Sequence, residues 1–528
     1  MPTHDLGTRA ARGIVVSVAG QGLRIGIQVL SVLLLARLLA PGDYGLLAMV
    51  VAVIGVAEVF RDLGLTTAAI RARQLSAAQR TNLFWISTAL GAVLSTAAFL
   101  AAPLVAALFD RTELEDMTRA LAWVFVLSGV AAQYRADLTR RMRFGVLALA
   151  DVLAPLAGLG VALALALGGA GYWALVTQQL VQYGVMTVAV VVAGRWLPGR
   201  PSRRTPMDDL LRFGAGLVGI ELIGYAGRNA DSLLIGARFG ATDLGLYNRV
   251  HQLLMVPLGQ LRVPTTQVAL PVLGRLQDDE RRWAEFVRRG QLALGYTLVA
   301  GLGIVVGTAG PVVAVFLGDR WTETVPLLRW LAVGGACQTL AFVGYWVYLS
   351  RGLTGALTRF SLFETGVRLV AIAVGSAWGV VGLAAGFALA PALTWPISLW
   401  WLSRLAPIPR AQLVAGALRV LTVTGVVAAA SAGVTALLGD APAPLVLVLA
   451  AGAGAAAYLA ITVWGPFRAD LREVRSAVRE GLRGRRAPAP EPGSSPDPGA
   501  VAAVPAAAGL PVAASSVAGA GEASCPAR

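Results

Sequence analysis

The sequence of 528 residues contains no lysine, so all 44 of its basic residues are arginine. A P-loop nucleotide site needs a lysine to reach the terminal phosphates, and a Schiff-base enzyme needs one as its nucleophile. Both classes are therefore excluded. The two histidines and two cysteines do not fall into the spacing of a zinc site. We expect no metal, no cofactor and no structural disulfide.

Charge is also scarce. Only 14% of the residues are charged and 56% are hydrophobic, whereas an average soluble domain has about 25% and roughly 45–50%. Apolar runs long enough to cross a bilayer, about 20 residues each, recur along almost the whole chain. The predicted fold class is an all-α polytopic membrane protein with about 14 transmembrane helices. We place these spans near 13–36, 44–60, 82–109, 117–134, 144–167, 172–193, 213–236, 244–268, 291–317, 325–350, 361–377, 380–402, 411–437 and 442–466.

The first apolar run resembles a signal sequence, because Arg9 and Arg12 precede it. It is long, it carries polar residues, and it lacks a convincing small-residue cleavage site. We interpret it as an uncleaved first span.

The arginines test the count and the orientation of the spans. With the N-terminus inside, the inner loops and tails hold 32 arginines, and the outer loops hold only Arg37, Arg111, Arg238 and Arg320. One missed span would scramble this alternation, so the positive-inside rule favours both the number and two cytoplasmic termini. The net charge of +15 is thereby explained as a topology signal. We expect no nucleic-acid partner.

We expect six regions in the chain. A six-helix lobe covers 1–193, a cytoplasmic linker 194–212, a second six-helix lobe 213–402, and two additional helices 411–466. Residues 467–485 predict a basic amphipathic cytoplasmic helix on the anionic inner leaflet. Residues 486–528 are rich in Pro, Ala, Gly and Ser and are expected to be disordered.

An internal repeat supports the two lobes. The stretch Ala36–Leu46 parallels Ala237–Leu246, and Thr66-Thr67 parallels Thr265-Thr266, at a separation of 199 to 201 residues. That separation spans six helices. Because six is even, the copies have the same orientation, related by an axis along the membrane normal.

Polar residues inside the spans form the candidate site, because a charge at mid-bilayer costs about 2.5–3.5 kcal/mol. If the lobes face each other, spans 1, 7 and 8 bring three arginines to a common interior. The residues that share the polar faces of these spans are the substrate-binding candidates: Gln21, Arg24, Gln28, Glu221, Arg228, Asp231, Arg249 and Gln252.

The alternative interpretation of these residues is structural. Arg228 and Asp231 are three residues apart and can form an ion pair within one helix. Arg24 has no acidic residue in reach on its own helix, which favours a water-filled cavity over a buried pair.

Several motifs in order resemble the Wzx-type oligosaccharide flippases. They are Leu35–Leu46 at the first outer turn, Asp62–Leu65, Gly171–Val176, Arg228–Gly236 and Leu244–Tyr247. The resemblance extends to about residue 405. One departure is Ala230, which stands where a polar or larger residue is more usual.

That family belongs to the MOP superfamily, with multidrug exporters of the MATE type and the lipid II flippase. The resemblance implies a two-lobed, V-shaped fold with alternating access in the bacterial inner membrane. The implied substrate is an undecaprenyl-diphosphate-linked oligosaccharide, moved to the outer leaflet for lipopolysaccharide or exopolysaccharide assembly. Polymerases or glycosyltransferases are possible partners, besides membrane lipid. Arginines suit the diphosphate, and glutamines suit sugar hydroxyls.

Three other functions stay open. A MATE-like cation or drug antiporter should show a carboxylate-rich first lobe, whereas the mid-span charges here are mainly arginine. A lipid II flippase stays an alternative because its substrate contains the same diphosphate. A polysaccharide polymerase or ligase would need catalytic carboxylates on a sizeable outer loop, and the outer loops here are short. We expect a transporter rather than an enzyme.

Overall fold

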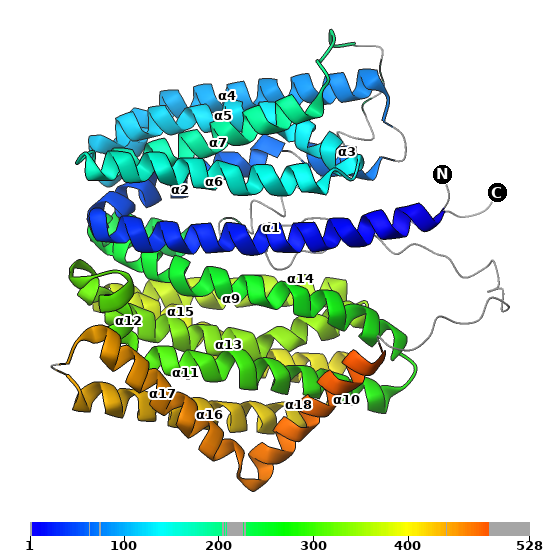
Figure 1. The fold of residues 1–528 in the computed structure, drawn as a ribbon, viewed down its shortest axis with the longest axis vertical. Coiled ribbons are helices and arrows are strands. Elements are labelled where there is room, and N and C mark those ends of the chain that lie inside the picture. Colours follow the sequence, from blue (N-terminus) through cyan, green and yellow to red (C-terminus); the bar gives the residue numbers. More distant parts are fainter. Residues whose placement is uncertain are drawn as a thin grey trace. The chain divides into compact units, whose positions relative to one another are not determined.

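The computed structural model describes residues 3–484 apart from 63, 73–74, 203–204, 206, 208–224, 226, 228 and 440. For 3–19, 59, 61–62, 71, 263 and 477–484 it describes the backbone alone. Every regular element in this part of the chain is helical (Figure 1). Two compact units can be distinguished. The first unit comprises 1–253, 313–327 and 369–386, and the second comprises 254–312, 328–368 and 387–528.

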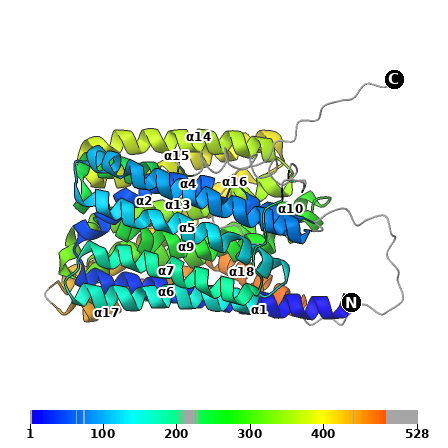
Figure 2. The same ribbon diagram turned by 90° about the horizontal axis from the view of Figure 1, so that it is seen from above.

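Seven helices precede residue 200. They are α1 Thr3–Leu38, α2 Pro41–Asp62, α3 Leu65–Arg71, α4 Ala77–Phe109, α5 Glu113–Arg140, α6 Phe144–Leu167 and α7 Tyr172–Gly194. In the first unit α4 packs along α5, α6 along α7, and α1 on α6, and Figure 2 shows α6 and α7 side by side. The predicted span 213–236 lies mostly outside the described residues, and helical backbone is described over 229–239.

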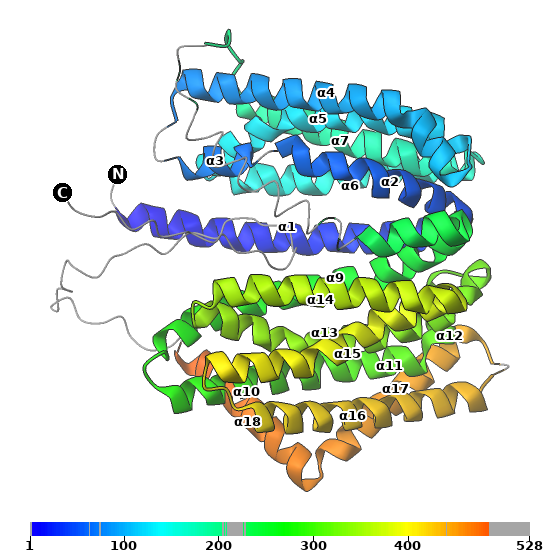
Figure 3. The same cartoon turned by 180° about the vertical axis from the view of Figure 1, so that it is seen from behind.

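The remaining chain contains both long helices and short turns. The elements are α9 Ala241–Arg275, α10 Glu280–Leu294, η1 Gly295–Val299, α11 Ala300–Gly307, α12 Ala309–Phe316, η2 Asp319–Thr324, α13 Val325–Ser350, α14 Thr354–Gly375, η3 Ser376–Trp378, α15 Gly379–Leu405, α16 Arg410–Leu437, α17 Ala443–Thr462 and α18 Gly465–Gly484. In the second unit α16 packs along α17 and α11, and Figure 3 shows α13 beside α15.

Ten stretches of the described chain are long and apolar enough to cross a membrane. One of them, Thr354–Leu405, contains both α14 and α15. The predicted spans 117–134 and 244–268 correspond to α5 and α9, which are too polar to be among the ten. The protein is therefore an all-helical, multi-pass membrane protein.

Glycine contacts bring the helices of the first unit close together. A Cβ added at Gly91 of α4 would lie 2.5 Å from the carbonyl oxygen of Phe125 of α5, and one at Gly129 would lie 2.6 Å from that of Ser87. Only residues without a side chain permit this approach, which is the usual way in which membrane helices pack without a hydrophobic driving force.

Arginines also connect α3, α4 and α5 of the first unit at one end of these helices. Asp137 of α5 pairs with Arg80 at 3.1 Å and with Arg141 at 2.9 Å. The guanidinium of Arg140 donates to the carbonyl of Ala72 at 2.6 Å, so it satisfies the free C-terminal end of α3. These arginines therefore have a structural role.

Candidate functional site

The two copies of the repeat meet where α2 and α9 begin. A Cβ at Gly45 of α2 would lie 1.6 Å from the carbonyl oxygen of Ala241, and a Cβ at Gly245 of α9 would lie 1.9 Å from that of Pro41. Gly45 and Gly245 are 200 residues apart, as are Pro41 and Ala241. Each copy therefore contacts the other through the same positions, as two parts related by a local two-fold axis do.

Arg249 lies one turn beyond this crossing and is almost fully buried, with 6% of its surface exposed. Its Cζ atom is 3.6 Å from the centroid of the Tyr44 ring, and its Nη1 donates to Oε1 of Gln252 at 3.1 Å. Its Nε has no hydrogen-bond partner. No carboxylate of the described residues lies within ion-pair distance of Arg249, so its charge is balanced there only by the face of an aromatic ring.

Tyr44 is held in place by a second aromatic residue. The rings of Tyr44 and Trp321 meet edge to face with centroids 5.5 Å apart, and Nε1 of Trp321 donates to the carbonyl of Ala36 at 2.8 Å. The buried hydroxyl of Tyr44 has no partner. The Tyr44 ring is thus fixed under the guanidinium, which preorganises Arg249 for an additional acceptor.

Asp231 is buried in the helical stretch 229–239, which precedes α9. Its Oδ2 accepts from the hydroxyl of Tyr247 at 2.7 Å, and its Oδ1 accepts from the backbone N–H of Ser232 at 2.8 Å. The hydroxyl of Ser232 donates to Oδ1 of Asn248 at 3.2 Å. Asp231 therefore links residues 229–239 to α9 and shares its charge with a tyrosine. Arg228, the partner that sequence spacing suggested, lies outside the described residues, as does Glu221.

The predicted polar stripe of α1 is in a different environment. Gln21 and Arg24 are exposed and Gln28 is half-buried. No hydrogen bond or ion pair joins Arg24 to another described residue. Further along α1, Ser31 accepts from Nε2 of Gln178 on α7 at 2.8 Å. Arg24 is thus available to solvent or ligand, whereas Arg249 is fixed and buried.

Of the eight candidates, the structure places Arg249 and Gln252 in direct contact. Asp231 is bonded to Tyr247, which precedes Arg249 by two residues on α9. Among the described residues, no hydrogen bond or ion pair joins this group to Arg24 or Gln28. Tyr44 and Tyr247 are site residues that sequence reasoning missed. The signal for Tyr44 was present in the repeat, where it directly precedes Gly45, the residue at the crossing.

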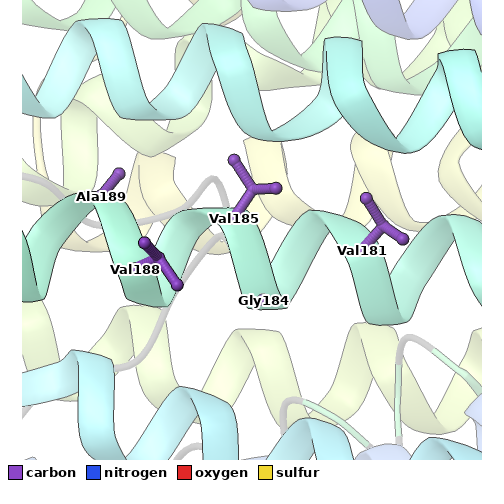
Figure 4. Close-up of a pocket in the computed structure, with 5 residues that line it drawn as sticks. All are labelled: Val181, Gly184, Val185, Val188 and Ala189. Atoms are coloured by element: carbon purple, nitrogen blue, oxygen red, sulfur yellow. The ribbon is translucent and has the colours of Figure 1, made fainter.

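A shallow hollow of about 430 Å³ lies elsewhere in the first unit, on α7 (Figure 4). It is lined by Val181, Gly184, Val185, Val188 and Ala189. A surface without polar groups suits hydrocarbon, so it cannot recognise a phosphate or a sugar. Among the described residues no three histidine, cysteine, aspartate or glutamate side chains are grouped as a metal site would require.

Comparison with known proteins assigns the chain to a family. Residues 34–326 match the family described as polysaccharide biosynthesis protein. The chain belongs to that family. It is 26% identical over 373 residues to the lipopolysaccharide biosynthesis protein WzxC of Escherichia coli, covering 69% of this chain and 75% of WzxC. It is 23% identical to the succinoglycan biosynthesis transport protein ExoT of Rhizobium meliloti, covering 64% and 68%.

Two solved structures share the fold. The lipid II flippase MurJ, in an inward closed conformation, matches with a TM-score of 0.65 and 10% identity, covering 85% of this chain and 98% of MurJ. An inward-facing MATE multidrug transporter of the MOP superfamily matches with a TM-score of 0.52 and 16% identity, covering 75% and 98%. At these identities the likeness concerns the fold alone.

Proposed function

We propose that this family member is a transporter that moves an undecaprenyl-diphosphate-linked oligosaccharide from the inner to the outer leaflet, for lipopolysaccharide or exopolysaccharide assembly. A diphosphate is anionic and a sugar chain is strongly hydrated, so neither crosses hydrocarbon unaided. Membership of the family and the names of WzxC and ExoT support polysaccharide biosynthesis as the process. The fold shared with a lipid flippase supports transport rather than catalysis.

The observation that carries the proposal is the state of Arg249. A buried guanidinium is costly unless a counter-charge or hydrogen bonds compensate it, and Arg249 has an unpartnered Nε and no described carboxylate beside it. A diphosphate supplies the missing charge and acceptors, because arginine recognises phosphate with several planar donors. We assign Arg249, Arg228 and the exposed Arg24 to the diphosphate, and Gln21, Gln28 and Gln252 to the sugar hydroxyls. Glu221 and Asp231 complete the set of polar candidates for this site, and Asp231 is held by Tyr247 and Ser232.

A cation or drug antiporter of the MATE kind is the first competing function. Such a transporter needs carboxylates free to take a cation. In the first unit Asp137 is paired with arginines, Asp151 lies 3.0 Å from Nη1 of Arg135, and Asp231 accepts from Tyr247. These carboxylates are engaged by the protein itself, which favours an anionic substrate.

The other two competing functions are a lipid II flippase and a polysaccharide polymerase or ligase. Lipid II offers the same diphosphate, so the arginines alone do not discriminate against it; the names of the relatives favour an oligosaccharide. A polymerase or ligase needs catalytic groups on the outer face. Between α4 and α5, and between α6 and α7, only a few residues connect the helices, which disfavours an extramembrane catalytic domain.

The topology proposed with this function is that of a bacterial inner-membrane protein with both termini cytoplasmic. Fourteen helices form lobes at 1–193 and 213–402 plus two helices at 411–466. Alternating access then opens the cavity between the lobes to each side in turn, and the crossing of Gly45 and Gly245 forms part of the outer closure. Glycosyltransferases would supply the substrate inside and a polymerase would use it outside.

Deletion of the gene tests the proposal in cells. We expect the lipid-linked oligosaccharide to accumulate facing the cytoplasm, where an outside-acting glycosidase cannot reach it in intact spheroplasts. A plasmid copy should restore normal levels. Accumulation of lipid II instead would favour a lipid II flippase. Accumulation of an outward-facing intermediate would favour a polymerase or ligase.

A further inference from the structure

Helix α18 follows directly on a membrane-spanning helix. The 20-residue span α17 ends at Thr462, and α18 begins at Gly465 after a sharp bend (Figure 1). The two residues of the bend, Val463 and Trp464, are 65% and 73% exposed. An exposed tryptophan at the end of a span is typical of the boundary between hydrocarbon and headgroups. The first turn of α18 is therefore at the bilayer surface.

One side of α18 is attached to the protein by acidic residues. Asp470 is 5% exposed and accepts from Nε of Arg419 on α16 at 2.7 Å and from the hydroxyl of Tyr296 at 3.0 Å. Glu473 pairs with Arg288 and Arg289 of α10. These bonds fix the rotation of α18 about its own axis.

The apolar residues of α18 also face the protein. Phe467, Leu471 and Val474 pack against the buried cluster that contains Tyr296, Val420 and Val427. The helix thus has an apolar and acidic side that the second unit covers. It does not need the bilayer to bury Leu471 and Val474.

The opposite side carries arginines. Arg468, Arg472 and Arg475 recur at spacings of four and three residues, which places them along one stripe, and all three are exposed. No described residue forms an ion pair with any of them. Three uncompensated guanidinium groups are thus presented next to the bilayer surface by a helix whose orientation is fixed by other bonds.

We infer that Arg468, Arg472 and Arg475 form a binding site for the headgroups of anionic phospholipids. Phosphate is the group that guanidinium recognises through several donors, and basic segments beside a span are attracted to anionic leaflets. Because Asp470 and Glu473 hold α18 on the second unit, a lipid bound to the stripe holds that unit against one leaflet. This role is independent of what the protein transports.

Titration of the detergent-solubilised full chain with phosphatidylglycerol or phosphatidylcholine, followed by native mass spectrometry, tests the site. We expect R468Q/R472Q/R475Q to weaken phosphatidylglycerol binding on the order of tenfold or more and to leave phosphatidylcholine binding unchanged. The matched control R111Q/R281Q/R320Q removes three exposed arginines elsewhere and should bind as the wild type does. R468K/R472K/R475K keeps the charge and should retain most of the affinity.

Two results would overturn the site. One is phosphatidylglycerol binding by R468Q/R472Q/R475Q that equals that of the wild type. The other is an equal loss in the matched control, which would mean that net charge alone attracts the lipid. Because Asp470 and Glu473 are unchanged, the helix should stay docked, and an unaltered melting temperature checks this. Loss of transport has no bearing on the outcome, since binding is measured directly.

Discussion

The guanidinium of Arg249 lies over the ring of Tyr44, with Cζ 3.6 Å from the ring centroid. The two residues come from α9 and α2, whose first turns cross at Gly245 and Gly45. The contact therefore joins one residue from each copy of the internal repeat. It also leaves the Nε donor of Arg249 for a ligand.

The ring beneath Arg249 should matter more than its hydroxyl. Tyr44→Phe keeps the aromatic face and should transport at close to the wild-type rate. Tyr44→Leu removes an attraction of about 2 kcal/mol at a desolvated site, so we expect transport to fall by roughly tenfold or more. Equal rates in the two variants, at matched protein levels, would show that the ring does not position the guanidinium.

Arg24 is exposed and makes no described bond, so its replacement should not affect folding. We expect Arg24→Ala to impair flipping by about tenfold to a hundredfold, the loss expected from one hydrogen bond to a charged group, while protein levels and melting temperature stay near normal. Arg228→Ala should behave in the same way. Exposed Arg320 is a suitable control, and Arg320→Ala should be neutral. Full activity in both Arg24→Ala and Arg228→Ala would refute the proposed diphosphate site.

The crossing of α2 and α9 has no room for a methyl group at either glycine. Gly45→Ala and Gly245→Ala should each force the helices apart, at a cost of about 1–3 kcal/mol. If the crossing closes the outer face, a cysteine placed at Gly42, in a chain whose Cys337 and Cys525 are replaced by serine, should then react faster with a membrane-impermeant maleimide. Gly22→Ala is the control, since nothing lies within 4 Å of its added Cβ. Unchanged labelling and stability in both variants would show that the crossing is not a closure.

The membrane potential should drive the proposed movement. Carrying about two negative charges outward across an inside-negative membrane releases roughly 4–5 kcal/mol per 100 mV, so a coupling ion is unnecessary. We expect flipping to slow when the potential is collapsed and to persist when an ion gradient is removed at fixed potential. Loss of flipping on removing only the ion gradient would contradict this prediction.

Much of the fold could be predicted from the sequence, because the length and composition of each span are local properties. The helices α1, α2, α4, α6, α7, α16 and α17 fall where their apolar runs predict. The predicted spans 117–134 and 244–268 also coincide with helices, α5 and α9, but these helices are too polar to be among the ten apolar stretches. The docking of α18 through Asp470 and Glu473 could not be predicted, because Arg419, Arg288 and Arg289 are distant in sequence.

In the candidate site, too, contacts within one helix could be predicted from the sequence, whereas contacts between distant segments could not. Arg249 and Gln252 are three residues apart on one helix, so their contact follows from helical spacing. Tyr44 and Tyr247 look like ordinary core residues in apolar runs, and only the approach of other segments makes them partners of Arg249 and Asp231. The repeat predicted that the two outer turns are related. That they touch at Gly45 and Gly245 required the packing itself.

Reconstitution of the purified protein in vesicles with an undecaprenyl-diphosphate-linked oligosaccharide tests the central claim most directly. The measured quantity is the fraction of oligosaccharide that an impermeant glycosidase outside the vesicles can cleave. With an inside-negative potential this fraction should rise to nearly all of the substrate for the wild type and stay near half for Arg249→Gln. A wild-type fraction that stays near half, with the protein folded and correctly inserted, would contradict the account.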